Sequence, residues 1–443
     1  MAHVLAVADT DSYLKWSTST LDGLPAGWSS RQVLLRNAVM PTAGQVGAAG
    51  HPAVEVLSLT RLRSRLRREQ PDVLLLACTG PVVQTLTRLP LLRGGSRPVL
   101  LTGLPGISVP ASAKAVRLRR GCDLFVVHSH RERREFVELA ALHAPELGFG
   151  LARLPFLTRA TAPGAAAPGA AGAAASTGPL VFAAQALVPP ERADREAILR
   201  ALARAAPAVV KLRAAAGEQQ THREVHPYDL LWADLVRRGE VDRGAVGFAT
   251  GAMADALAGA RGLVTVSSTA ALEAVAQGLP IAVIDDFGVS AELINLVFEG
   301  AGCAASLAGL AGRLHHPHPD WLLDNYFHPE EDCDWLARLD GLVRLRAAGQ
   351  LPHPRPSVAL TPAGVLRQHL RLALSARDLA RADRLLRVLG RASARPRALG
   401  RRARARLRGR LGSAAPAGRR TAPRVGRPPP PPAIPPPPSA RGR

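Results

Sequence analysis

Short uninterrupted runs of Val, Leu and Ala alternate along this chain with stretches of helical periodicity. In the first half such runs occupy residues 3–8, 32–35, 54–57, 73–77, 99–102 and 124–127. After residue 178 the alternation restarts, with runs at 180–184, 208–212, 262–266 and 281–284. Strands without polar alternation are buried on both faces, which is typical of parallel sheets covered by helices. The sequence therefore predicts an α/β protein with two Rossmann-like parallel-sheet domains.

Composition marks the boundaries between these parts. A chain of 443 residues suits two domains with additional segments. Residues 158–178 consist almost entirely of Ala, Gly, Pro and Thr, which predicts a linker between domains at 1–157 and 179–350. Leucines at helical spacing among arginines predict a basic amphipathic helical segment at 351–390, either packed on the domains or lying on an anionic membrane surface. The Arg- and Pro-rich residues 391–443 predict a disordered tail.

Charge and cysteine usage exclude several classes of protein. Of the net charge of +22, fifteen arginines lie in residues 391–443, which contain no acid, so residues 1–390 carry only +7. Specific nucleic-acid binding by the folded part is therefore not expected. Four cysteines without a CxxC pair argue against a disulfide framework and a zinc knuckle.

No apolar run reaches the roughly 18 residues of a membrane span, and the first residues lack the basic flank of a signal peptide, so we expect a cytoplasmic protein. Peripheral contact with the inner membrane face stays open.

Polar residues follow several of the predicted strands. Ligands bind parallel sheets at the carboxyl ends of the strands, so these residues are candidates for a site. In the first half they are Asp9, Asp11, Thr79, Gly103, Gly106 and His128. In the second half Gln185 and Lys211 occupy corresponding positions.

The most informative stretch is residues 262–288. A buried run ends in Ser267, Ser268 and Thr269, and a predicted helix begins at once. Ser268 or Thr269 can cap this helix, while free N–H groups and the positive end of the helix dipole bind phosphate. Glu273, one turn into the helix, is placed to reach a ribose hydroxyl. Plain N-capping without a ligand is the alternative.

Residues 262–300 resemble the nucleotide-binding half of GT-B glycosyltransferases. In these enzymes a Ser/Thr- or Gly-rich turn, a helix with an internal Glu and a Gly-x-Pro strand hold a nucleotide sugar. The similarity to an uncharacterised bacterial glycosyltransferase-like family extends to residues 8–16 and 321–327. It implies a GT-B fold in which residues 1–157 bind the acceptor and residues 179–350 bind the donor nucleotide.

Lys211 supports the same interpretation from a different position. It is one of only three lysines and ends a buried run, where its ammonium would neutralise a diphosphate leaving group. The turn is similar to the Lys-x-His-Pro turn of bacterial capsule and sialic-acid transferases, but Arg213 replaces the His and no Pro follows. A strand-end lysine that reaches water is the alternative. The donor-binding residues implied by the resemblance are Gln185, Lys211, Arg213, Ser267, Ser268, Thr269 and Glu273.

The resemblance also implies a catalytic carboxylate in the first domain. An inverting transferase uses a carboxylate to deprotonate the acceptor hydroxyl, and Asp9 or Asp11 is the candidate base. Capping of the next helix is the alternative for Asp9. Thr79, Gly103, Gly106 and His128 are the acceptor-side candidates, although tight turns and a hydrogen-bonded strand-end histidine explain them equally well.

No metal and no cofactor is predicted. Asp9-Thr10-Asp11 matches a short metal-binding pattern of another glycosyltransferase fold, but the surrounding alternation does not fit that fold. His315, His316 and His318 stand among prolines, which prevent the i, i+4 helical pairing of two ligands, and His328 to Cys333 follow them. A solvated loop is expected there.

The predicted function is a metal-independent glycosyltransferase that moves a sugar from a nucleotide-sugar donor to a glycan or lipid-linked acceptor, such as a cell-surface glycan. Whether the sugar is of hexosyl or sialyl type is left open. An enzyme like UDP-GlcNAc 2-epimerase, which shares the fold, is the first alternative. A non-enzymatic membrane or nucleic-acid adaptor that acts through the basic tail is the second.

Overall fold

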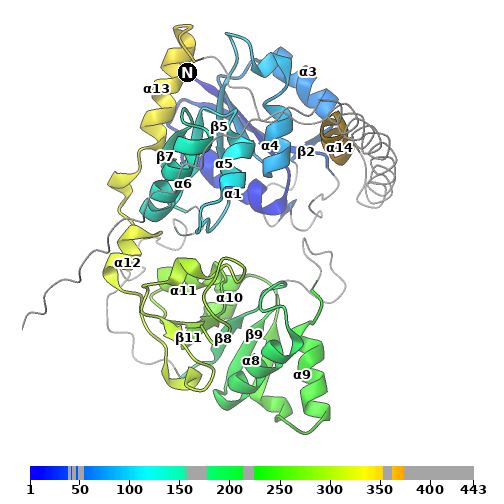
Figure 1. Ribbon diagram of the computed structural model, residues 1–443, viewed down its shortest axis with the longest axis vertical. Coiled ribbons are helices and arrows are strands. Elements are labelled where there is room, and N and C mark those ends of the chain that lie inside the picture. The colour runs from blue at the N-terminus through cyan, green and yellow to red at the C-terminus, as the bar shows by residue number, and fades with distance from the viewer. Residues whose placement is uncertain are drawn as a thin grey trace, which may run out of the picture. The chain divides into compact units, whose positions relative to one another are not determined.

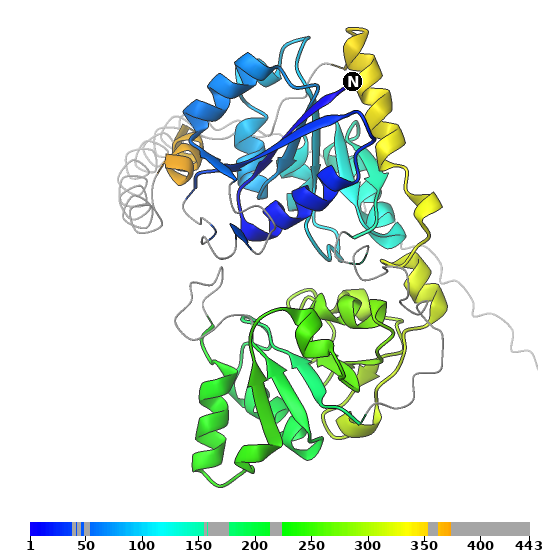
Figure 2. The ribbon, with the colours of Figure 1, turned by 180° about the vertical axis from the view of Figure 1, so that it is seen from behind.

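The computed structural model describes residues 1–37, 41, 46–47, 54–154, 157, 177–212, 224–352 and 362–373. Most of the expected linker, Arg213 and the tail at 391–443 lie outside these residues. The described part contains two α/β domains, each built on a fully parallel sheet (Figures 1 and 2). The predicted fold class is therefore confirmed.

The first domain contains a seven-stranded sheet in the order β3-β2-β1-β4-β5-β6-β7. Its strands are β1 (His3–Ala8), β2 (Ser29–Leu35), β3 (Glu55–Leu57), β4 (Val73–Ala77), β5 (Val99–Gly103), β6 (Leu124–Val127) and β7 (Gly148–Leu151). The helices that follow them are α1 (Asp11–Asp22), α3 (Leu59–Glu69), α4 (Gly80–Leu86), α5 (Ala113–Arg119) and α6 (His130–His143). β1 pairs in parallel with both β2 and β4, so the strand order reverses at its sides.

The second domain contains a six-stranded sheet in the order β10-β9-β8-β11-β12-β13. Its strands are β8 (Leu180–Ala183), β9 (Ala208–Lys211), β10 (Val246–Ala249), β11 (Gly262–Thr265), β12 (Ile281–Ile284) and β13 (Ala304–Ala305). Its helices are α8 (Arg192–Arg204), α9 (Tyr228–Arg237), α10 (Met253–Leu257) and α11 (Ala270–Ala276). Here β8 lies between β9 and β11, which repeats the reversal seen in the first domain.

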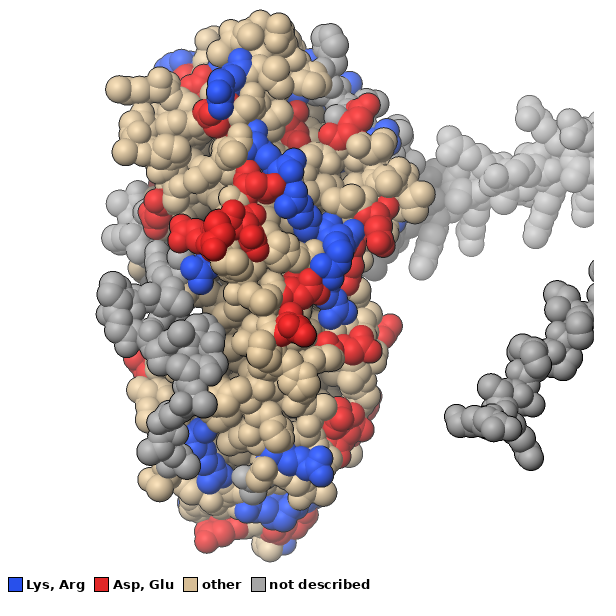
Figure 3. All heavy atoms as spheres, turned by 90° about the vertical axis from the view of Figure 1, so that its left-hand side faces the viewer, with Lys and Arg blue, Asp and Glu red and all other residues tan. Residues whose placement is uncertain are grey.

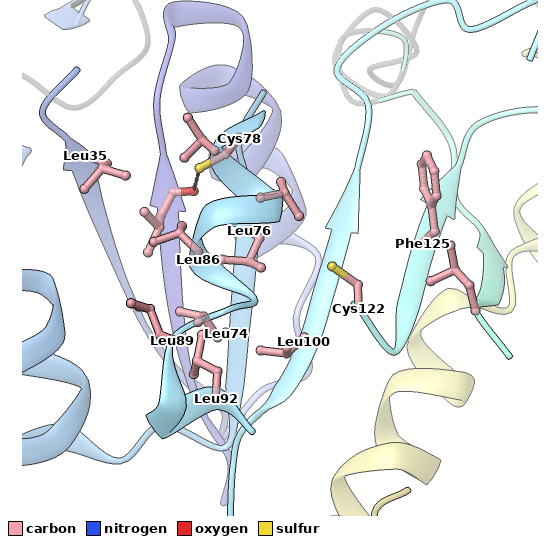
Figure 4. Packing of buried hydrophobic residues seen from close by; sticks show 14 of the residues in the cluster. Leu35, Leu74, Leu76, Cys78, Leu86, Leu89, Leu92, Leu100, Cys122 and Phe125 are labelled. Carbon is pink, nitrogen blue, oxygen red and sulfur yellow. Dashed lines mark hydrogen bonds between the residues drawn. The ribbon is translucent and has the colours of Figure 1, made fainter. Parts of the chain in front are cut away.

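Each sheet is buried on both faces because its strands send apolar side chains to two separate cores. In β1, Leu5 and Val7 join the cluster under α3 to α6, whereas Val4 and Ala6 join the cluster under α1. Figure 4 shows the first of these clusters, in which the Cys78 thiol donates to the carbonyl of Val7 over 3.1 Å. Burying each leucine of this kind contributes roughly 1.5–3 kcal/mol, which explains why the uninterrupted apolar runs form central strands.

Two helices that follow the second sheet in the sequence pack on different cores. α12 (Pro319–Asp324) places Trp321 in the core around α11, whereas α13 (Trp335–Ala347) places Trp335 and Leu339 in the core of the first sheet. A Cβ added to Gly150 of β7 would lie 2.7 Å from the Cα of Trp335, so the backbone of α13 rests directly on this strand. The boundary expected at residue 350 does not follow this packing, because an amphipathic pattern does not reveal which sheet a helix covers.

α14 (Pro362–Ala373) is the one helix in the described part of the segment expected at 351–390. It packs on α4, where Gln368 donates to the side chain of Gln84 over 2.8 Å and Leu372 joins the first core. Among the described residues, no helix combines the length and the apolar character that crossing a membrane requires. On the face of the protein in Figure 3, basic side chains lie beside acidic ones.

Candidate functional site

Asp9, which follows β1, is hydrogen-bonded to Thr79, which follows β4, and so joins the carboxyl ends of these two strands. One oxygen of its carboxylate, Oδ2, accepts hydrogen bonds from the backbone N–H of Thr79 (2.9 Å) and from its hydroxyl (2.6 Å). Asp9 is 1% exposed, and within the described part of the chain its other oxygen, Oδ1, has no hydrogen-bond partner. These ends mark the point where the strand order reverses, which is where open parallel sheets bind ligands. Two of the residues predicted from the sequence are thus brought together.

A buried arginine that the sequence analysis did not single out completes this cluster. Arg119 of α5 is 2% exposed and donates to the Tyr13 hydroxyl over 2.7 Å and to the Cys78 carbonyl over 3.1 Å. Its charge lowers the pKa of Asp9, but the effect of burial is larger. The helix after β1 is capped by Thr10, whose side chain accepts from Tyr13, and not by Asp9. The simpler alternative for Asp9 is therefore wrong, because Asp9 turns toward β4.

Burial of Asp9 predicts a specific dependence of stability on pH. Burial raises its pKa to about 6, whereas an aspartate in an unfolded chain titrates at about 3.9. Because the folded state holds this proton more tightly, ionisation destabilises it. The free energy of unfolding should fall as pH rises from about 4 to 6 and stay lower above that, by about 3 kcal/mol for a two-unit shift.

Asp9→Asn removes this titration. Urea unfolding of the wild type and the variant at pH 4 and pH 7 measures the effect, and the variant should gain stability relative to the wild type at the higher pH. Asp320→Asn, an exposed control, should follow the wild type at both pH values. Parallel behaviour of Asp9→Asn and the wild type would show that Asp9 does not titrate in this range.

Asp11 differs from Asp9 in its exposure. It lies in the first turn of α1, keeps 26% of its side chain exposed, and accepts from the Lys15 ammonium over 3.0 Å. Its Oδ1 is buried and, among the described residues, has no hydrogen-bond partner. The charge of Lys15 also lowers the pKa of Glu273 in the second domain. The Lys15 ammonium therefore acts electrostatically on Glu273 of α11.

Lys211 lies at the end of β9 and is 5% exposed. Its ammonium donates to the Leu212 carbonyl over 2.9 Å, and none of the described carboxylates lies within ion-pair distance of it. Burial lowers its pKa, while the charges of Glu273 and Asp255 raise it. Glu273 in turn has a pKa raised by burial and lowered by Lys211 and Lys15. The charges of Lys211 and Glu273 therefore influence each other's pKa.

In the second sheet, a hydrogen bond also joins the ends of two neighbouring strands, β8 and β11, where the strand order reverses. The hydroxyl of Ser267, after β11, donates to the side-chain carbonyl of Gln185, after β8, over 2.8 Å. Ser267 is 4% exposed. A buried hydroxyl already bonded to a protein amide is less available to a ligand than a free one. Ser267 and Gln185 therefore shape the turn that presents Ser268 and Thr269.

The turn before α11 differs in one respect from the expectation. Ser268 acts as the cap, since its hydroxyl accepts from the N–H of Ala270 over 3.2 Å, and Thr269 makes no capping bond. The N–H groups of Ala271 and Leu272 donate to the carbonyls of Ser268 and Thr269. The N–H groups of Ala270, Ala271 and Leu272 are therefore bonded within the turn and are not free donors at the start of this helix.

Thr269 lies close to Gly106, in the loop that follows β5 of the first domain. A Cβ added to Gly106 would lie 3.7 Å from the Thr269 methyl group. Gly103 has a packing role instead, because a Cβ there would lie 2.3 Å from the ring of Trp16. Of these two glycines, only Gly106 is next to a predicted donor residue.

His128 is a buried, hydrogen-bonded strand-end histidine. It is 1% exposed, its Nε2 lies 2.9 Å from the Trp16 indole nitrogen and 3.1 Å from the Leu104 carbonyl, and its Nδ1 lies 3.1 Å from the Ala152 carbonyl. The indole can only donate, so a neutral ring accepts at Nε2 and carries its proton on Nδ1, where it donates to Ala152. Burial lowers the pKa of His128 to about 4, so the ring is neutral at pH 7. This geometry favours the structural alternative over a role in proton donation.

His128 also lines a cavity of about 450 Å³ within the first domain. The other lining residues come from the end of α1, from β6, from the two residues after β7, and from the start of α13 and the segment before it, and include Thr20, Gly23, Arg153, Cys333 and Trp335. Of the residues predicted from the sequence, His128 alone borders this cavity. The cavity is therefore distinct from the cluster of Asp11, Lys15, Lys211 and Glu273.

Several solved structures match the chain over most of its length at low sequence identity. MnaA of S. aureus with UDP matches with 10% identity and a TM-score of 0.46, covering 81% of this chain and 99% of that one. UDP-GlcNAc 2-epimerase from Neisseria meningitidis matches with 11% identity and a TM-score of 0.44, covering 82% and 97%. HepE of Anabaena in complex with UDP and glucose matches with 15% identity and a TM-score of 0.43, covering 84% and 98%. Scores at this level do not carry a function from one chain to another.

Sequence comparison gives a clearer assignment. No curated protein matches this chain. The model of a family described as "Putative glycosyltransferase (DUF6716)" matches residues 4–342, which include both sheets and most of α13. The chain belongs to this family.

Proposed function

We propose that this protein transfers a sugar from a nucleotide-sugar donor held by the second domain to an acceptor held by the first. The observation that carries this proposal is the buried ammonium of Lys211, which acts electrostatically on Glu273, with Lys15 of the first domain acting on the same glutamate. Among the described residues no carboxylate lies within ion-pair distance of the Lys211 ammonium, and Glu273 acts on it only at longer range, so a bound anion would compensate its charge. A diphosphate is such an anion.

Each group of this cluster has a proposed role. Lys211 stabilises the negative charge that develops on the departing phosphate, and the hydroxyls of Ser268 and Thr269 donate to its oxygens. Glu273 accepts from a ribose hydroxyl and keeps Lys211 protonated. An ammonium in this place provides the neutralisation that a divalent cation would otherwise supply, so we propose a transfer that needs no metal.

Asp11 is the better candidate for the base that activates the acceptor. A base must reach the acceptor hydroxyl, and Asp11 is partly exposed whereas Asp9 is buried and bonded to Thr79. Asp9 then acts as a positioning residue for the ends of β1 and β4. Gly106, next to Thr269, leaves room for the acceptor near the donor phosphates.

A thermal-shift screen of the full chain tests the donor class. UDP-, CMP-, GDP- and dTDP-sugars are compared at equal concentration, and one class should raise the melting temperature because only the folded state binds it. Product analysis then separates transfer from epimerisation. No shift with any of the four classes, or an epimerised sugar as the product, would overturn the proposal.

Lys211→Met should weaken binding of the stabilising nucleotide sugar by roughly 10- to 100-fold, the usual effect of losing a charge-assisted hydrogen bond. Isothermal titration calorimetry measures the dissociation constant. Lys114→Met removes an exposed lysine of α5 and is the matched control, for which no change is expected. Equal affinities of the two variants would exclude Lys211 from the donor site.

Three further predictions remain proposals. Arg213, a candidate donor-binding residue, lies outside the described residues. The acceptor, a glycan or lipid-linked molecule, is proposed from the resemblance alone. Contact with an anionic membrane at the inner face, and the alternative of an adaptor, both involve the tail at 391–443, which the structure does not describe.

A further inference from the structure

Two histidines and an aspartate from distant parts of the sequence meet beside the first domain. His130 begins α6, whereas His328 and Asp332 lie between α12 and α13. The Nε2 of His130 is 2.9 Å from an oxygen of Asp332, and the two imidazole rings have centroids 5.3 Å apart. One ligand atom from each residue lies within 4.8 Å of the other two.

The buried His328 supplies a second, independent observation. Its side chain is 0% exposed, and its Nδ1 lies 3.1 Å from the carbonyl of Pro329. A carbonyl can only accept, so Nδ1 carries the proton and Nε2 carries a lone pair. Within the described part of the chain this Nε2 is buried and has no hydrogen-bond partner. A buried acceptor without a partner is unfavourable unless another group fills its place.

We propose that His130, His328 and Asp332 bind a zinc ion. Two imidazole nitrogens and a carboxylate oxygen are ligands that zinc prefers, and water completes the tetrahedron. Ligands of one tetrahedral zinc lie about 3.3 Å apart, so the three groups must approach one another slightly. His130 and Asp332 are 33% and 37% exposed, which leaves both side chains free to adjust and opens a path for the ion.

The Pro329 carbonyl would orient His328 through a hydrogen bond without contacting the zinc ion itself. Zinc-binding histidines generally donate their second ring N–H to a carbonyl or carboxylate, which fixes the tautomer and the direction of the ring. His328 already makes such a bond. The buried His328 therefore already has the tautomer that zinc binding requires, whereas the partly exposed side chains of His130 and Asp332 can move toward the ion.

The ion would fasten the segment after α12 to α6. Three contacts already join the same elements: Tyr326 donates to Glu132 over 2.7 Å, Arg134 binds Asp324 over 2.6 Å, and Arg133 binds Asp334 over 2.9 Å. None of the three ligands belongs to the cluster around Lys211, so this inference does not depend on the proposed function.

Zinc binding by the untagged full chain tests the inference. After treatment with a chelator and its removal, Zn²⁺ is titrated in competition with a chromogenic chelator. One high-affinity site per chain is expected, and saturation at 100 times the dissociation constant should raise the melting temperature by roughly 5 to 10 °C. His328→Gln and Asp332→Asn should each weaken binding at least about tenfold.

Control variants distinguish loss of the zinc site from a general effect of a substitution on the fold. His316→Gln removes an exposed histidine outside the cluster and should bind zinc as the wild type does. Asp332→Asn alters a partly exposed side chain, so it provides the answer if His328→Gln does not fold. Circular dichroism checks the fold of each variant. Equal zinc affinity of Asp332→Asn, His316→Gln and the wild type, or no site that competes with the chelator, would overturn the proposal.

Discussion

Asp11→Asn is expected to lower kcat for donor turnover by roughly 10²- to 10⁴-fold, the range that a general base contributes. The amide retains the size of the carboxylate and can still accept a hydrogen bond, but it cannot take the proton of the acceptor hydroxyl. The expectation rests on the exposure of Asp11 and on the unpartnered Oδ1 described above. Release of the nucleoside diphosphate in steady state measures kcat and KM separately, and KM for the donor should change little.

Two matched variants distinguish proton transfer from other effects of losing Asp11. Asp320→Asn also removes an acid from the first turn of a helix, α12, and should leave kcat unchanged. Lys15→Met breaks the same ion pair from the other side. If Lys15→Met reduces kcat as strongly as Asp11→Asn, Asp11 acts through Lys15 and is not the base. If Asp9→Asn alone reduces kcat strongly, the base is Asp9.

Arg195→Met is expected to destabilise the second domain by about 3–5 kcal/mol, as removal of one partner from a buried ion pair does. Arg195 of α8 is 1% exposed and binds the Glu224 carboxylate over 2.5 Å. Its guanidinium also lies 4.9 Å from the ring centroid of Tyr228. The remaining N–H groups donate to the carbonyls of Gln185, Ala186, Pro189 and His226. Methionine fills the volume but leaves these acceptors without a donor.

The denaturation midpoint in urea measures this loss. Arg200→Met is the control on the same helix: its side chain is 34% exposed and pairs with Glu196 and Glu240, so about 1 kcal/mol or less is expected. Because Arg195 holds the carbonyl of Gln185, the loop after β8 should also lose order, and donor affinity should fall further than for Arg200→Met. An unfolding midpoint equal to that of Arg200→Met would contradict a central role for Arg195.

The sequence predicted the two sheets because their strands are apolar on both sides, a local property. It also named Lys211 as a candidate for binding the donor, since ligands bind parallel sheets at the carboxyl ends of the strands. Both predictions use only the periodicity of the chain and its direction. The order of the strands in each sheet does not follow from such patterns.

Contacts between distant residues could not be predicted in this way. Nothing near Gly103 indicates that the ring of Trp16 lies against it, and nothing near His328 indicates that His130 is its neighbour. The prolines around the histidine-rich segment argue against helical pairing of ligands within that segment, but they give no information about a ligand from α6. Arg195 was missed because an arginine on an amphipathic helix usually faces solvent, and only the folded loop shows what surrounds it.

The position of α13 also affects how this protein can be synthesised. Trp335 and Leu339 cover the first sheet, yet they are translated after every strand of the second. On the ribosome, a nascent chain that has produced all seven strands of the first sheet has α1 but still lacks α13, the second helix that covers this side of the sheet. A gene fragment ending near residue 157 would therefore encode a protein in which the apolar surface under α13 is exposed to water.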